Sequence, residues 1–122
     1  MLIIVINFMV LLIAILHFLF FILETFLWQK DLGRKIFKTD KNFVKKSAAL
    51  AANQGLYNAF LSAGLIWSLM TNGSEALHLK FFFLSCVMLA GIFGAVTVSV
   101  RILLVQAVPA IFTLVLLGSL FI

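Results

Sequence analysis

The sequence predicts an all-α integral membrane protein, a four-helix bundle with both termini on the outer side of the membrane. Apolar residues make up 65% of the chain and its mean hydropathy is +1.25, far above a soluble domain. These residues form long continuous runs, whereas barrel strands would alternate. Seven of the nine Lys and Arg residues lie between positions 29 and 46. We therefore expect one multi-pass transmembrane domain over residues 1–122 and a basic cytoplasmic loop.

The first helix is expected at about residues 2–28, because its apolar run exceeds the roughly 20 residues that cross a bilayer. Its polar interruptions are few, namely Asn7, His17, Glu24 and Thr25. The run lacks a basic leading segment, carries Glu24 and has no small-x-small cleavage site before the basic loop. We therefore expect it to be a retained helix and not a cleaved signal peptide.

The three remaining helices are expected at about residues 45–70, 76–98 and 102–122. The first of these ends at the turn cluster Thr71–Ser74. Arg101 interrupts an apolar stretch that is too long for one span, so the last two helices should be joined by a tight turn near residues 99–101.

Basic residues near the ends of spans predict the orientation of the chain. If the 29–46 loop and Arg101 lie in the cytoplasm, only Lys80 of the nine Lys and Arg residues lies outside. The loop itself is either an amphipathic interfacial segment or, as is more usual, a solvated topology signal. Its expected partners are membrane lipids with anionic headgroups, and no nucleic acid is expected because the charges flank a span.

Small residues recur where helices are expected to pack closely in lipid. The second helix has one at every fourth position, and the third has two pairs spaced by four: Ala51, Gly55, Ala59 and Ala63, then Ala90 with Gly94 and Gly91 with Ala95. The two helices should therefore approach closely. The contact is expected either within one chain or in a homo-oligomer.

Polar side chains inside spans are costly and usually face a bundle interior or a wet cavity. With a rise of about 1.5 Å per residue, Glu24 lies about 6 Å from the cytoplasmic end of its helix. His17 and Glu24 are two turns apart on one stripe of the first helix. A stripe of the second helix likewise carries Gln54, Tyr57 and Asn58. Pro109 should free one backbone carbonyl in the last helix. We therefore predict a ligand-binding recess that opens to the cytoplasm, formed by His17, Glu24, Asn53, Gln54, Tyr57, Asn58, Arg101 and Gln106.

The sequence favours no metal or cofactor. Cys86 is the only cysteine, there are two His residues, and no metal-ligand spacing is present. No nucleophile elbow, phosphate loop or redox cysteine pair supports an enzyme. A non-enzymatic role is therefore the first expectation.

Four strings carry a resemblance to a known family: Leu23–Trp28, Ala51–Asn58, Ala90–Gly94 and Val105–Ala110. On the patterns LExFLW and NQGxYN within them, the chain resembles the bacterial domain-of-unknown-function family thirteen-hundred-and-four, small predicted four-span membrane proteins. The resemblance implies that fold and a bacterial plasma membrane, but no activity.

A fainter likeness is to the membrane-associated eicosanoid and glutathione metabolism proteins, four-helix units that trimerise around lipophilic substrates. Their Arg-bearing pattern in the second helix is missing here, because residues 48–57 contain no Arg or Glu. Glutathione chemistry is not expected on this likeness.

Three functions remain open from the residues. The first is binding or transport of a small polar, cationic or lipid-like molecule, with Glu24 as its charged anchor. The second is an enzyme acting on a lipophilic substrate, for example an isomerase, with Glu24 or His17 as general base and Tyr57 or Asn58 polarising an oxygen. The third is a structural or accessory role, in which the polar residues only fix the packing of the bundle.

Overall fold

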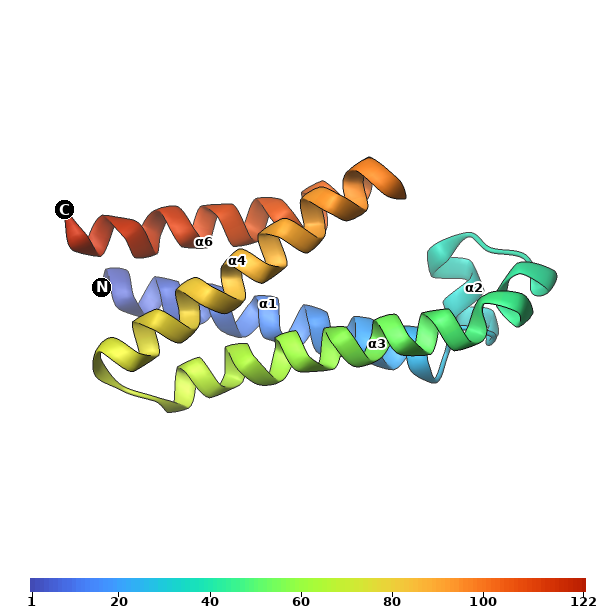
Figure 1. Cartoon of the computed structure of the whole chain (residues 1–122), viewed down its shortest axis with the longest axis horizontal. Coiled ribbons are helices and arrows are strands. Elements are labelled where there is room, and N and C mark those ends of the chain that lie inside the picture. The colour runs from blue at the N-terminus through green and yellow to red at the C-terminus, as the bar shows by residue number, and fades with distance from the viewer. The chain divides into compact units, whose positions relative to one another are not determined.

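The computed structural model describes residues 1–122 and contains helices and no strands (Figure 1). This confirms the all-α prediction. In chain order the elements are α1 (Leu2–Thr25), α2 (Asp31–Phe37), α3 (Lys41–Met70), α4 (Gly73–Thr97), α5 (Val100–Ile102), a π-helical segment (Leu103–Ala107), α6 (Val108–Gly118) and a final 3-10 turn (Ser119–Phe121).

Three helical segments are long and apolar enough to cross a membrane, judged by length and composition: Leu2–Thr25, Gly73–Thr97 and Val100–Phe121. This agrees with a membrane protein. Helix α3 is the longest helix, at 30 residues, but it is not among these three. Its Asn53, Gln54 and Asn58 side chains lower its hydropathy, so the expected fourth span is not established by composition.

Part of the predicted basic loop is helical. Helix α2 occupies residues 31–37, and α3 begins at Lys41, four residues before the expected start. The early start has a local cause, because the Asp40 carboxylate accepts a hydrogen bond of 2.8 Å from the backbone N–H of Phe43. A side chain in this position satisfies one of the free donors at the start of a helix.

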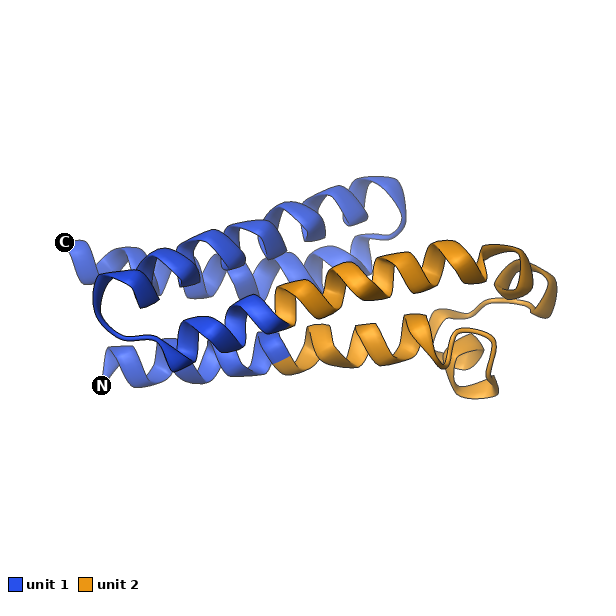
Figure 2. Ribbon diagram, turned by 60° about the horizontal axis from the view of Figure 1, so that its bottom comes forward, with its two compact units in different colours: residues 1–14, 63–122 blue, residues 15–62 orange.

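The chain divides into two compact units, which Figure 2 shows in different colours. Unit 1 comprises residues 1–14 and 63–122, and unit 2 comprises residues 15–62. Helices α1 and α3 each contribute one part to both units.

In unit 1, α4 packs against the π-helical segment and α6. A Cβ atom built on Gly91 would lie 2.6 Å from the backbone nitrogen of Ala107, so the two backbones touch where Gly91 has no side chain. A Cβ atom built on Gly64 of α3 would likewise strike the Phe83 ring of α4. The small residue Gly91 therefore packs against the last helix, whereas α3 and α4 meet at Gly64.

The turn between α4 and α5 is as tight as the sequence predicts, with two residues between the helices. The Ser99 hydroxyl accepts a hydrogen bond of 3.3 Å from the backbone N–H of Arg101 and so caps α5. The π-helical segment precedes Pro109, and the N–H of Val108, the first residue of α6, donates to the carbonyl oxygen of Leu103. Proline lacks a backbone donor, and helices commonly kink at prolines and at π-helical turns.

In unit 2, the end of α1 lies against the first half of α3. Gly55 is buried, and a Cβ atom on it would meet the Thr25 side chain and, at 3.2 Å, the backbone oxygen of Phe21. Gly33 likewise allows α2 to approach the end of α1 closely, because a Cβ atom there would strike the carbonyl of Leu27. Glycine at these two positions lets three backbone segments meet around the end of α1.

Candidate functional site

The site begins with a hydrogen bond between α1 and α3. Asn58 Nδ2 donates to Glu24 Oε1 at 2.9 Å, and it also lies 3.3 Å from the backbone oxygen of Gln54. Both side chains are half-buried. The contact is possible because Gly55, less than one turn before Asn58, brings the helices together; a Cβ atom on Gly55 would lie 3.3 Å from Glu24 Cβ. Asn58 thus holds one of the two carboxylate oxygens of Glu24.

A recess of about 290 Å³ opens beside Glu24 at the end of α1. Its lining carries a carboxylate, a hydroxyl, an amide and an ammonium group together with two aromatic rings: Glu24, Thr25, Phe26, Trp28, Gln29, Lys30 and Ala48. Thr25 Oγ1 is buried and has no hydrogen-bond partner. The recess therefore offers a negative and a positive side chain, together with a hydroxyl group that lacks a hydrogen-bond partner.

Trp28 holds one wall of this recess in place. Its indole Nε1–H donates to Ser47 Oγ at 3.0 Å, and Ser47 Oγ donates to the backbone oxygen of Phe43 at 2.6 Å. The Trp28 ring also packs against Phe37, with ring centroids 5.1 Å apart, and against Phe43 at 6.2 Å. Side chains from α2 and α3 thus fix a residue that lies in the turn after α1.

The other predicted residues of unit 2 lie outside the recess. His17 is fully buried and meets the Phe20 ring edge-on at 5.8 Å. Asn53, Gln54 and Tyr57 are exposed on α3, and the Tyr57 ring lies against that of Phe60. The stripe that the sequence predicts is thus split, because only Asn58 turns toward α1.

Arg101 and Gln106 belong to unit 1. Arg101 is exposed in α5, and Gln106 is half-buried in the π-helical segment. Their convergence with Glu24 stays a prediction, as does the eight-residue site as a whole.

Sequence reasoning identified Glu24 but missed the other lining residues of the recess. Thr25, Phe26, Trp28, Gln29 and Lys30 directly follow Glu24 in the chain, in a segment expected to continue the helix to residue 28. Helix α1 instead ends at Thr25, so these side chains wrap around its end and do not follow helical spacing. The run of polar residues from Gln29 onward was the one available signal.

No group of three or more His, Cys, Asp or Glu side chains is placed to hold a metal ion. The lining of the recess offers hydrogen-bonding and charged groups. Its chemistry suits a ligand with polar or ionic groups.

Comparison with known proteins places the chain in a family. A family described as a protein of unknown function, DUF1304, matches residues 11–118. The chain is similar to the uncharacterized protein YpaA of Lactococcus lactis subsp. lactis strain IL1403, with 29% identity over 107 residues, which cover 86% of this chain and 89% of the relative. No solved structure matches. The matched range includes Glu24, Asn58 and the whole lining of the recess, and the chain belongs to the DUF1304 family of proteins of unknown function.

Proposed function

We propose that this protein is a small multi-pass membrane protein whose recess beside Glu24 binds a small polar, cationic or lipid-like molecule from the cytoplasmic side. The observation that carries the proposal is the Glu24 carboxylate, which borders the recess with one oxygen held by Asn58. A half-buried carboxylate at the end of an apolar helix is costly unless a partner compensates it. A single amide donor supplies part of that compensation, and a bound ammonium group would supply the rest.

The charges of the lining narrow the class of ligand. Glu24 and Lys30 both line the recess, so it presents an acid and a base within one cavity of about 290 Å³. A ligand with an ammonium and a phosphate group satisfies both, whereas a simple cation satisfies only Glu24. The Phe26 and Trp28 rings give the remaining apolar contact. A zwitterionic lipid headgroup is therefore the ligand that this lining fits best.

The proposal includes a topology of four spans, with α3 as the fourth. At about 1.5 Å per residue, 30 helical residues extend about 45 Å, enough to cross the roughly 30 Å hydrocarbon core. The hydrogen bond to Glu24 lowers the cost of placing Asn58 in lipid. The basic segment then faces the cytoplasm and both termini face outward. A plasma membrane location agrees with a bacterial relative.

Lipid binding to the purified protein tests this proposal. The probe is short-chain phosphatidylethanolamine in an uncharged detergent, with binding followed by native mass spectrometry. We expect Glu24→Gln to weaken binding by roughly 10- to 100-fold, because one charge-assisted hydrogen bond contributes roughly 1.5–3 kcal/mol. Glu75→Gln is the matched control, since Glu75 is exposed in the first turn of α4. Equal binding by both variants would refute the proposal.

The same hydrogen bond favours a second candidate, a structural role in which Glu24 and Asn58 only fix the packing of α1 on α3. Under this alternative, Asn58→Ala lowers the stability of the protein without ligand, and no variant changes lipid binding. Measuring stability and binding on the same variants separates the two functions.

A further inference from the structure

A second cavity lies between α2 and the first turns of α3. Its volume is about 290 Å³, and it is lined mainly by basic and polar side chains: Gln29, Asp31, Arg34, Lys41, Val44 and Lys45. It shares only Gln29 with the recess beside Glu24. The cavity is therefore a separate candidate site within unit 2.

Positive charge dominates this cavity. Arg34, Lys41 and Lys45 face one acid, Asp31, which forms an ion pair of 2.5 Å with Arg34 Nη2. The Asp31 side chain is 98% exposed, so water screens its charge strongly, whereas the Arg34 side chain is only 22% exposed. The cavity is thus set up to attract an anion.

One donor of the Arg34 side chain is unsatisfied. Arg34 Nε is buried and has no hydrogen-bond partner. Buried polar groups are almost always paired, and leaving one unpaired is costly. The guanidinium plane matches the oxygens of a phosphate, to which it can donate two parallel hydrogen bonds. Arg34 Nε is closed to solvent and Nη2 pairs with Asp31, so a phosphate group in the cavity would meet the charge of the guanidinium beside those of Lys41 and Lys45.

We propose that this cavity is a phosphate-binding site, with Arg34 donating to the phosphate and Lys41 and Lys45 balancing its charge. The phosphate belongs either to a lipid headgroup or to a soluble phosphate ester. The cavity lies a few residues beyond the end of the apolar helix α1, where phosphates of the bilayer surface are within reach. This site is independent of the ligand proposed beside Glu24.

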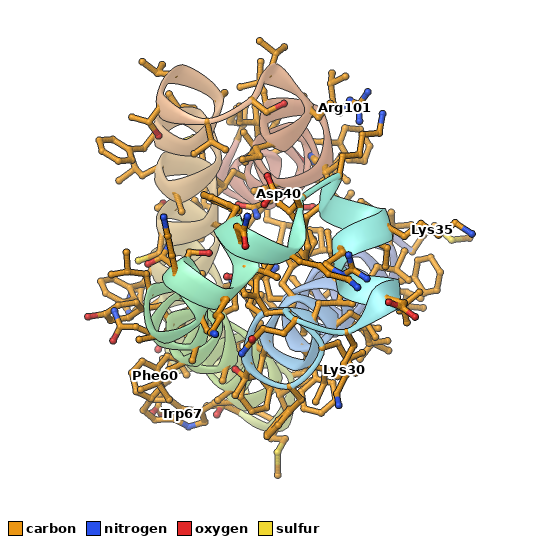
Figure 3. All side chains as sticks on the ribbon, turned by 90° about the vertical axis from the view of Figure 1, so that its right-hand side faces the viewer. Lys30, Lys35, Asp40, Phe60, Trp67 and Arg101 are labelled. Atoms are coloured by element: carbon orange, nitrogen blue, oxygen red, sulfur yellow. The ribbon has the colours of Figure 1, made fainter.

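Neighbouring lysines provide an internal comparison. Lys35 lies on the same helix as Arg34 but does not line the cavity, and Figure 3 shows it projecting away from the ribbon. Removing its charge changes the total charge of the segment as much as removing that of Lys45. If the site is specific, loss of the Lys45 charge weakens phosphate binding more than loss of the Lys35 charge. If the attraction is only to the total charge of the segment, both losses weaken it equally.

The experiment measures binding by titration calorimetry to the full chain in an uncharged detergent. The probes are inorganic phosphate, short-chain phosphatidylglycerol and, as the phosphate-free match, a diacylglycerol with the same acyl chains. We expect saturable binding of a phosphate-bearing probe at one site per chain and none of the diacylglycerol at this site. Arg34→Gln and Lys45→Gln should each weaken it about tenfold, the loss of one charge-assisted hydrogen bond. Lys35→Gln should leave it within about twofold.

The outcomes separate the two sources. Binding of the lipid alone identifies a headgroup site, and binding of inorganic phosphate as well identifies a site open to soluble esters; both support the proposal. Equal losses in Lys35→Gln and Lys45→Gln, or equal binding of the diacylglycerol, overturn it. Because Arg34→Gln also removes an ion pair within α2, Lys45→Gln decides the result if circular dichroism shows that the arginine variant is misfolded.

Discussion

Lys80 Nζ donates a hydrogen bond of 2.8 Å to the backbone oxygen of Ser68. Lys80 belongs to α4 and is 3% exposed, and Ser68 lies in the last turn of α3, where its hydroxyl donates to the Leu65 carbonyl at 2.6 Å. The last carbonyls of a helix lack partners within the helix and carry partial negative charge. The Lys80 ammonium therefore caps α3 from the neighbouring helix. The sequence had placed this lysine on the outer side as an exception to the charge bias.

Replacing Lys80 by Met should destabilise the protein by about 1–3 kcal/mol, because the apolar side chain fills the space but leaves the Ser68 carbonyl unpaired. The measurement is reversible unfolding in mixed detergent micelles. Lys46→Met is the control, since Lys46 is exposed. If both substitutions have the same small effect, Lys80 does not stabilise the end of α3.

Gly91→Ala should destabilise the protein by about 1–3 kcal/mol through overpacking against Ala107. The added Cβ atom would lie 2.6 Å from the Ala107 nitrogen and 2.9 Å from its Cβ atom, so backbone must move. Gly118→Ala is the matched control, because nothing lies within 4 Å of a Cβ atom there. Thermal unfolding followed by circular dichroism compares the two, and equal melting temperatures would contradict the close packing of α4 on the last helix.

A double-mutant cycle with Glu24→Gln and Asn58→Ala measures the hydrogen bond between α1 and α3. We expect a coupling free energy of about 0.6 kcal/mol, with roughly 1.7 kcal/mol as an upper value for such bonds in membrane proteins. Pairing Glu24→Gln with Gln54→Ala gives the comparison, since the Gln54 side chain is exposed on α3. Additive effects in both cycles would show that the contact makes no net contribution.

Lys38→Gly should stabilise the end of α2 by up to about 1 kcal/mol. Lys38 has φ 54° and ψ 49°, a left-handed conformation that disfavours residues with a Cβ atom by roughly 1–2 kcal/mol, whereas glycine adopts it freely. Lys35→Gly removes the same charge from a right-handed helical position and should destabilise by about 1 kcal/mol. Hydrogen exchange of the α2 amides reports both changes. A loss of protection in Lys38→Gly would contradict the strain attributed to the left-handed conformation of Lys38.

The apolar runs of the sequence predicted three of the helices within a few residues, because the length of such a run can be read from the sequence without knowledge of tertiary contacts. The basic loop was harder, because short helices depend on caps and tertiary contacts. Helix α2 forms where Gly33 rests on the Leu27 carbonyl, and α3 starts early where Asp40 caps it. Neither contact follows from periodicity. The recess was missed for the same reason, since Phe26, Trp28, Gln29 and Lys30 of its lining lie in the turn after α1.

The sequence by itself determined the class of protein, the helical content and the charge asymmetry, because these depend on composition and on runs of similar residues. It also singled out Glu24 and Asn58 as polar residues in apolar surroundings. Only the tertiary structure decided that they touch, while Gln54 and Tyr57 face outward. The spacing of residues fixes which side chains share a face of a helix. Which helix packs against that face depends on where two backbones can approach each other. Here α1 and α3 approach closely because Gly55 has no side chain.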